Sequence, residues 1–194
     1  MAWRLFSYLT RRALVVVLVA TAVVPWAMAA DSDASPHFVR QALTQATLAG
    51  QGQLRFFRLH IYDAKLWVSP QFEAQSYERQ PLALELTYRR AFTGAAIAQR
   101  SIEEIQRQRS LSPAQAERWR QALAAVLPDV QAGDRLTSLY QPAQGMRLWR
   151  GTEELSPIQD AELAQLFFGI WLSPRTSEPD LRRALLGQIT KSTP

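Results

Sequence analysis

The sequence predicts an α+β fold in which a layer of helices covers one face of an antiparallel sheet. The first observation is the order of the segments, because early strand-like segments precede two helices, and a later strand hairpin precedes two more. This order lacks the regular strand–helix alternation of a parallel sheet. The second observation is that no Gly/Ser or Pro tract divides the chain and no internal repeat is present. We therefore expect one folded domain.

Three segments have the composition of strands. Residues 54–68 are rich in aromatic and β-branched side chains, but the alternation fails at the adjacent Phe56 and Phe57. A β-bulge or a strand-to-strand turn at this point would restore one buried face. Residues 81–88 place apolar side chains at alternate positions, and residues 135–150 form a hairpin around a turn-forming stretch that contains Pro and Gly.

Four segments have the apolar spacing of helices, and they are residues 93–108, 112–127, 160–172 and 177–186. Ser112 and Asp160 stand where side chains cap the first turn of a helix. In the first helix, Arg100 and Glu104 are spaced to form an ion pair, which we place on its outer face.

The N-terminal segment predicts export from the cytoplasm. Residues 1–29 combine an Arg-containing start, an apolar run at residues 13–24 and a small-x-small site before Ala30. The apolar run is shorter than the roughly 20 residues of a spanning helix, and Pro25 interrupts it. We predict a signal peptide cleaved after Ala29, with no stable membrane span afterwards and a periplasmic or secreted protein. An uncleaved N-terminal anchor is the alternative.

Charge and composition argue against several classes of protein. The chain has 22 Lys and Arg against 17 Asp and Glu, and three of the Arg lie in the predicted signal peptide, which leaves 19 against 17. These charges are scattered, so we expect no nucleic-acid partner. With no Cys and only His37 and His60, no metal site is expected. No phosphate-binding loop or nucleophile elbow is present, and we expect no cofactor.

Short motifs in a set order carry a resemblance to a known family. They lie at residues 52–55, 61–67, 84–90, 133–136 and 168–172. Together they resemble the chalcone isomerase-like family, whose bacterial members resemble secreted or periplasmic proteins. The resemblance implies an open-faced β-sandwich, with a ligand cleft between an antiparallel sheet and a helical layer on one of its faces. We expect this domain at residues 50–190, after a polar linker and lead-in segment at residues 30–49.

The resemblance also implies a set of site residues. Arg55 matches the family's strand Arg, and Tyr62 falls near a position where chalcone isomerases have Thr. The family's helical Tyr and Asn are replaced by Ile97 and Glu104, so most of the groups that stabilise an enolate are missing. Ile97 cannot donate a hydrogen bond, and a carboxylate at position 104 opposes an anionic transition state. We therefore favour a domain without catalytic activity.

An Arg and a Tyr beside an apolar cleft suit a small amphipathic anion. Non-enzymatic relatives resemble fatty-acid-binding proteins, so a fatty acid is the expected ligand. We predict Arg55 as the charge anchor with Tyr62 assisting, and Phe57 and Trp171 as apolar contacts.

Other interpretations remain open at this stage. One is an isomerase or lyase acting on an enolisable or phenolic substrate, with Arg55 and with Glu104 as a base. Another is an envelope interaction module without a small-molecule site, for which we expect a solidly packed sheet–helix interface and an exposed apolar patch. In the last, Arg55 is an ordinary surface residue of a strand.

Overall fold

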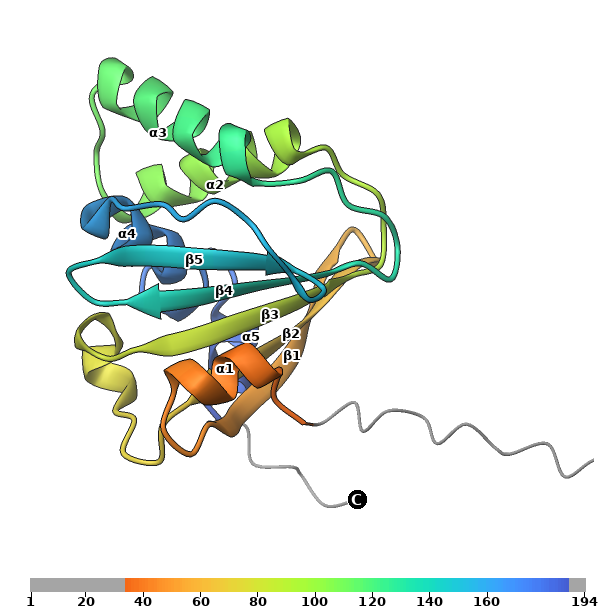
Figure 1. Cartoon of the computed structure of the whole chain (residues 1–194). Helices are drawn as coiled ribbons and strands as arrows, with labels where there is room; N and C mark the ends of the chain where they lie inside the picture. Colours follow the sequence, from red (N-terminus) through yellow and green to blue (C-terminus); the bar gives the residue numbers. More distant parts are fainter. Residues whose placement is uncertain (1–33, 189–194) are drawn as a thin grey trace, which may run out of the picture. The chain divides into compact units, whose positions relative to one another are not determined.

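Six antiparallel strands form one meandering sheet in which each strand pairs with the next in sequence (Figure 1). The computed structural model describes residues 34–188, and every element below lies in this range. The strands are β1 (Thr47–Phe56), β2 (Leu59–Val68), β3 (Leu82–Tyr88), β4 (Arg135–Gln141), β5 (Gly145–Arg150) and β6 (Glu153–Glu154). The predicted α+β class, an antiparallel sheet with a helical layer, is confirmed.

The first hairpin explains the interrupted alternation in the sequence. Strands β1 and β2 pair up to Phe56 opposite Leu59, and Phe57 and Arg58 form the turn. Leu54 pairs with Tyr62 and Arg55 with His60, so the register shift between them leaves Ile61 of β2 as the extra residue of a bulge. Both devices expected from the sequence, a bulge and a turn, therefore occur within a few residues.

Five α-helices and one 3-10 helix complete the described chain. They are α1 (His37–Ala42), η1 (Ala74–Arg79), α2 (Gly94–Gln108), α3 (Pro113–Val126), α4 (Ala161–Leu172) and α5 (Pro179–Leu185). The Ser112 hydroxyl accepts a hydrogen bond from the backbone N–H of Gln115, and Asp160 accepts one from Leu163, so both predicted caps are present. Helix α5 begins at Pro179, two residues later than expected, because Pro fits the first helical position.

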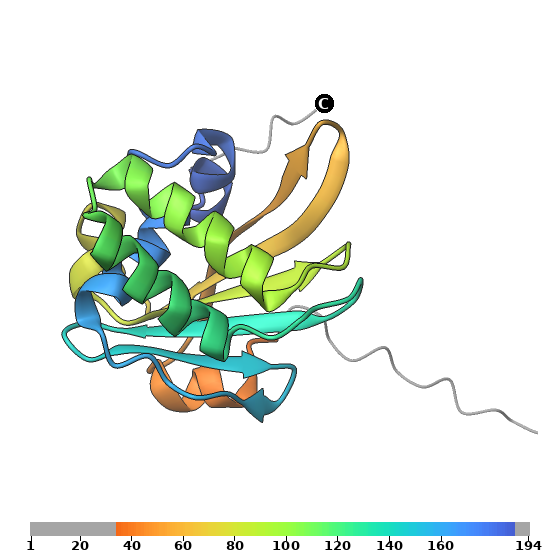
Figure 2. The same ribbon diagram turned by 90° about the horizontal axis from the view of Figure 1, so that it is seen from above.

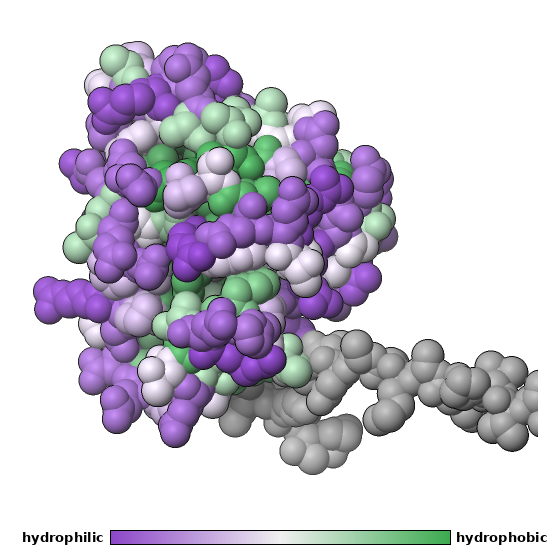
Figure 3. Space-filling model, in the orientation of Figure 1, coloured by the Kyte–Doolittle hydropathy of each residue, from purple (hydrophilic) through white to green (hydrophobic). Residues whose placement is uncertain are grey.

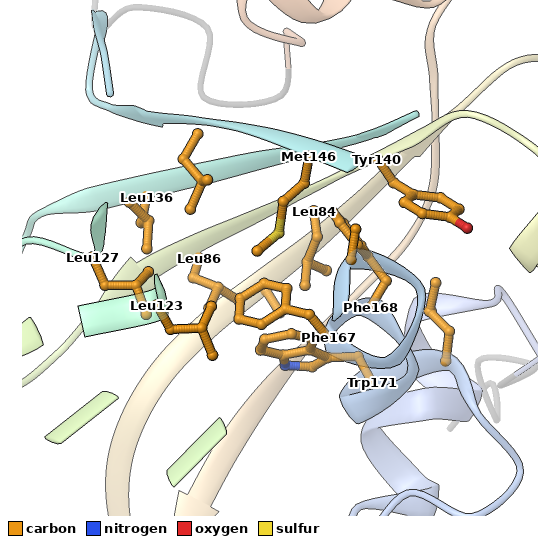
Figure 4. Packing of buried hydrophobic residues seen from close by; sticks show 14 of the residues in the cluster. Leu84, Leu86, Leu123, Leu127, Leu136, Tyr140, Met146, Phe167, Phe168 and Trp171 are labelled. Carbon is orange, nitrogen blue, oxygen red and sulfur yellow. The ribbon is translucent and has the colours of Figure 1, made fainter. Parts of the chain in front are cut away.

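Helices α2, α3, α4 and α5 lie on one side of the sheet, and the β1–β2 hairpin projects beyond them (Figure 2). Helix α4 supplies large aromatic side chains, and Phe167, Phe168 and Trp171 point toward the sheet (Figure 4). Phe168 packs against Tyr140 of β4 with a ring-centroid distance of 5.1 Å. Burying such large apolar side chains is the main term that holds the helical layer on the sheet.

The opposite face of the sheet carries a smaller apolar cluster under α1. Val39 and Leu43 pack against Trp67, Leu139 and Trp149, all of them buried. Phe38 stacks on the Trp149 ring at 4.3 Å. The packed unit therefore extends N-terminally past residue 50, where we expected the domain to begin.

Two glycines of β1 allow α5 to approach the edge of the sheet. A Cβ atom on Gly50 would lie 2.1 Å from the Ala184 carbonyl oxygen, and one on Gly52 would lie 2.7 Å from Leu181 Cδ1. Only a residue without a side chain fits at such distances. These glycines place α5, and the segment before it, against the first hairpin.

Hydrophilic side chains cover most of the surface seen in Figure 3, and apolar ones gather below α3. None of the helices described between residues 34 and 188 combines the length and apolar character that crossing a bilayer requires. The predicted signal peptide, residues 1–29, lies outside the described residues.

Candidate ligand pocket between sheet and helices

A cavity of about 350 Å³ separates the first strands of the sheet from α2, α4 and the segment that leads into α5. This volume is within the range of small-molecule sites, at its lower end. Its lining is mainly apolar and includes Leu54, Phe56, Ile61, Leu86, Phe92, Ile97, Leu127, Leu136, Phe167 and Ile170. We call this cavity the sheet–helix pocket. The interface between sheet and helices is therefore not packed solid. A solid interface is the expectation for an interaction module without a small-molecule site.

Tyr62 and Trp171 meet at the wall of the pocket. The indole N–H of Trp171 donates to the Tyr62 hydroxyl oxygen at 2.9 Å, and both side chains are buried. Burial raises the pKa of Tyr62 far above its ordinary value, although the Trp171 hydrogen bond opposes the shift. The hydroxyl therefore keeps its proton. Because Trp171 occupies the oxygen as an acceptor, the Tyr62 proton is available for a ligand.

Tyr88 is a second buried phenol beside the first. It pairs with Tyr62 across β2 and β3, and the two rings meet edge to face with centroids 5.9 Å apart. Burial raises the pKa of Tyr88 as well, so it also remains a neutral phenol. Within residues 34–188 its hydroxyl has no hydrogen-bond partner, and Tyr88 lines the pocket.

Charged side chains of α2 stand at the same end of the pocket as Tyr62. Arg100 Nη2 lies 2.6 Å from Glu104 Oε1, and Arg107 Nε lies 3.5 Å from the same oxygen. The Glu104 side chain is only 6% exposed, and its Oε1 has ion-pair contacts but no hydrogen bond of good geometry. The predicted Arg100–Glu104 pair therefore exists, but Glu104 faces the pocket and not the outer face of the helix.

A second carboxylate approaches from the segment before α5. Glu178 lines the pocket, and its pKa is raised first by burial and next by the negative charge of Glu104, while Arg100 partly offsets the shift. The pocket lining thus holds Arg100 with two carboxylates, Glu104 and Glu178. This arrangement favours a proton on Glu178, because two carboxylates beside one guanidinium repel each other.

A family model for chalcone isomerase-like proteins matches residues 34–187. The chain belongs to the chalcone isomerase-like family. It is 31% identical over 143 residues to an uncharacterized protein of Haemophilus influenzae, a match that covers 74% of this chain and 68% of the relative. Among solved structures it resembles a fatty-acid binding protein of Arabidopsis thaliana with a TM-score of 0.57, 8% identity, and coverage of 74% of this chain and 87% of that one. That likeness shows the fold.

Arg55 does not lie in the pocket, so the expectation that it anchors the ligand's charge there is wrong. Leu54 and Phe56 line the pocket, and successive side chains of a strand point to opposite faces, so Arg55 points away from it. Arg55 is exposed, and its guanidinium donates from Nε and Nη2 to Gln53 Oε1 at 3.3 and 3.1 Å. Strand alternation read from Leu54 and Phe56 alone would have indicated this orientation.

Phe57 is likewise not a pocket residue. It occupies the turn between β1 and β2 with 85% of its surface exposed, because the chain reverses there and its side chain leaves the sheet. Of the predicted ligand contacts, the structure brings together Tyr62 and Trp171, and it places Arg55 and Phe57 elsewhere.

Sequence reasoning missed Arg100, Tyr88 and Glu178 as pocket residues. A signal for the polar wall was present in α2, where Ile97, Ser101 and Glu104 follow the spacing of a single helix face. A polar residue at a helix position that otherwise faces the core indicates that this face borders a cavity. No group of three or more His, Cys, Asp or Glu in the described part of the chain is arranged to hold a metal ion.

Proposed function

We propose that this chalcone isomerase-like protein binds a fatty-acid-like ligand in the sheet–helix pocket, without catalysing a reaction, and that it does so in the periplasm. The observation that supports this best is an apolar cavity of about 350 Å³ with a buried phenol, Tyr62, whose proton has no acceptor in the part of the chain that the structure describes. Arg100 stands at the same wall and supplies the permanent positive charge.

A ligand carboxylate can bind at this wall only if a proton is taken up as well, because two carboxylates of the protein already stand there. Arg100 and the Tyr62 hydroxyl can donate to a carboxylate, while Glu104 and Glu178 repel it. The pKa of Glu178 is already raised, chiefly by burial, and a ligand carboxylate beside it would raise it further, so binding favours the protonated form, which can donate a hydrogen bond. Binding is therefore expected to take up a proton, so that affinity increases as the pH falls.

The acyl chain would lie among the apolar side chains of the sheet and of α4. Leu86, Leu136 and Phe167 line this part of the cavity. The volume suits a medium-length chain better than a long one, since it stands near the lower end of the range for ligand sites. The structural neighbour from Arabidopsis thaliana is a fatty-acid binding protein, which supports this class of ligand.

Titration calorimetry with dodecanoate tests the proposal. We expect Tyr62→Phe and Arg100→Met each to weaken binding about tenfold, the effect of losing one hydrogen bond to a charged group. Arg55→Ala is the matched control and should bind as the unaltered protein does, because Arg55 points away from the pocket. Arg100→Met combined with Glu104→Gln separates loss of the donor from exposure of an unpaired carboxylate.

Changing the ligand's head group and the pH gives results that could contradict the proposal. Between pH 8 and pH 6, dodecanoate affinity should increase in the unaltered protein and change less in Glu178→Gln. Equal affinity for dodecanoate, dodecanol and dodecylamine would show that the head group is not recognised. Absence of dodecanoate binding at any of these pH values, or an equal loss in Arg55→Ala, would contradict the proposal.

The proposed location has its own test. The segment at residues 1–29 has the parts of a secretory signal peptide, which supports export. Cell fractionation followed by N-terminal sequencing should find a periplasmic protein that begins at Ala30. An intact N-terminus in the membrane fraction would support the anchored alternative.

A second candidate function is an isomerase or lyase reaction, because Glu104 presents a buried carboxylate to the same cavity as Tyr62. In such a reaction Glu104 would remove a proton next to a carbonyl group, and Tyr62 would donate to the enolate oxygen. Proton–deuterium exchange into phenolic ketones would reveal it. Exchange that disappears in Glu104→Gln while dodecanoate binding persists would favour this function over the first.

A further inference from the structure

Exposed apolar side chains gather at one end of the molecule, the tip of the β1–β2 hairpin. Among residues 34–188 the exposed large hydrophobic side chains are Phe56, Phe57 and Leu59, which are 55%, 85% and 46% exposed. All three belong to residues 56–59, which we call the hairpin tip. This hairpin extends beyond the helical layer (Figure 2). Apolar exposure confined to four consecutive residues indicates a contact surface.

The backbone of the tip is unusual for the residues that form it. Phe57 and Arg58 have φ angles of 46° and 66°, in the left-handed region that two-residue hairpin turns normally fill with Asn or Gly. A bulky aromatic residue is strained in this conformation, because its Cβ approaches the following carbonyl oxygen. Because the Phe57 side chain is exposed, burial within the fold does not offset this strain. The strained turn instead presents the aromatic ring to the surroundings, which is common for contact sites.

The surroundings of the tip are basic. Arg55 and Arg58 belong to the hairpin, and neither makes an ion pair with a described acidic residue. Arg89 follows β3, and its backbone N–H donates to the Ile61 carbonyl, so Arg89 and the adjacent Arg90 lie beside the hairpin. Of the nearby acids, Asp63 is engaged by Arg89 and His60, and Asp134, which lies beside Tyr88, is paired with Arg150. The tip therefore combines exposed aromatic rings with an excess of positive charge.

We propose that the hairpin tip docks on the surface of a membrane that contains anionic lipids. Aromatic and Leu side chains enter the boundary between head groups and acyl chains, while Arg side chains remain with the phosphates. The charge of the tip matches an anionic bilayer, and the chemistry of residues 56–59 matches its interface. Docking does not require an occupied pocket, but Phe56 also lines the sheet–helix pocket, so docking would bring an edge of the pocket to the bilayer.

Vesicle sedimentation with the protein purified after export, without residues 1–29, tests this surface. We expect binding to vesicles of phosphatidylcholine with phosphatidylglycerol, and much weaker binding to phosphatidylcholine alone. Phe57→Ser should reduce binding at least tenfold, since one fully buried aromatic side chain corresponds to about that factor or more. Arg58→Ser should reduce it about fivefold and flatten its dependence on salt. Arg118→Ser, an exposed Arg on α3, is the matched control and should change nothing.

A fluorescence measurement detects docking without depending on a variant that loses binding, so it separates docking from effects on folding. In Phe57→Trp the new indole should shift its emission to shorter wavelength on anionic vesicles and not on neutral ones. Failure of the unaltered protein to bind anionic vesicles would overturn the proposal, and so would an equal loss in Phe57→Ser and Arg118→Ser. The vesicle measurement uses protein without dodecanoate. A failure to bind dodecanoate in solution would therefore count against the proposed pocket ligand and not against docking of the hairpin tip.

Discussion

The two ends of the sheet–helix interface differ in how they are filled. At the β4–β5 end, Phe168 from α4, Tyr140 and Leu148 are almost completely buried and belong to one apolar cluster. At the β1–β2 end, α2 faces the sheet with Ile97 and Glu104 and leaves a cavity. The same layers thus form a solid core at one end and a ligand-sized space at the other.

The difference lies in the side chains that fill each end. Phe168 of α4 is fully buried at the packed end, whereas α2 presents Ile97, Ser101 and Glu104 to the pocket. Polar groups on an inner face are costly unless they are paired or reach a ligand or water. The packed end therefore provides stability, and the open end provides chemistry.

The largest expected effect is at the packed end. Phe168→Ala should lower the free energy of unfolding by about 3–5 kcal/mol, because it leaves a cavity in a well-packed region. Ile97→Ala, at the open end, should cost less than about 2 kcal/mol, since its neighbours already border empty space. Urea unfolding of both variants measures the contrast. Equal losses would show that the two ends are packed alike.

A smaller effect on stability but a clear one on binding is expected when the open end is filled. Ile97→Trp should occupy part of the cavity and change the free energy of unfolding by only about 1 kcal/mol. Dodecanoate affinity should fall at least tenfold in the same variant. Calorimetry and urea unfolding on one preparation separate the two results. A large loss of stability would mean that the cavity cannot accept a ring.

The smallest expected effect is a dependence on pH. The pKa of Glu178 is raised in the folded state, chiefly by burial, so the protonated side chain favours folding. This advantage is complete below the pKa of Glu in the unfolded chain, about 4.3, and is lost as the pH rises through the folded-state pKa. Relative to Glu178→Gln, the unaltered protein should therefore lose stability as the pH rises. Urea midpoints of both proteins measure it, and parallel pH profiles would contradict it.

Local signals predicted the fold more reliably than they predicted the site. Ser112 and Asp160 cap helices because a cap depends on residues three positions away. Arg55 was assigned to the pocket through a family motif, although alternation with Leu54 and Phe56 places it on the other face. The motif identified the residue type but not the face of the strand on which its side chain lies.

The rest of the site depends on distant segments. Tyr62 and Trp171 are more than a hundred positions apart, and their hydrogen bond forms because α4 packs on the face of the sheet from which the Tyr62 side chain projects. Glu178 reaches the pocket because Gly50 and Gly52 allow α5 to sit close to β1. Such meetings are set by packing between layers, which local sequence patterns do not contain.

The order of the strands has a consequence for how the chain folds. Neighbouring strands follow one another in sequence throughout the sheet, and only the β3–β4 pair is separated by a long insertion, the one that contains α2 and α3. Short hairpins close quickly, whereas closure of a long loop must overcome a larger entropy cost. Pairing of β3 with β4 is thus the step expected to limit the rate of folding, and the same step encloses the pocket beneath α2.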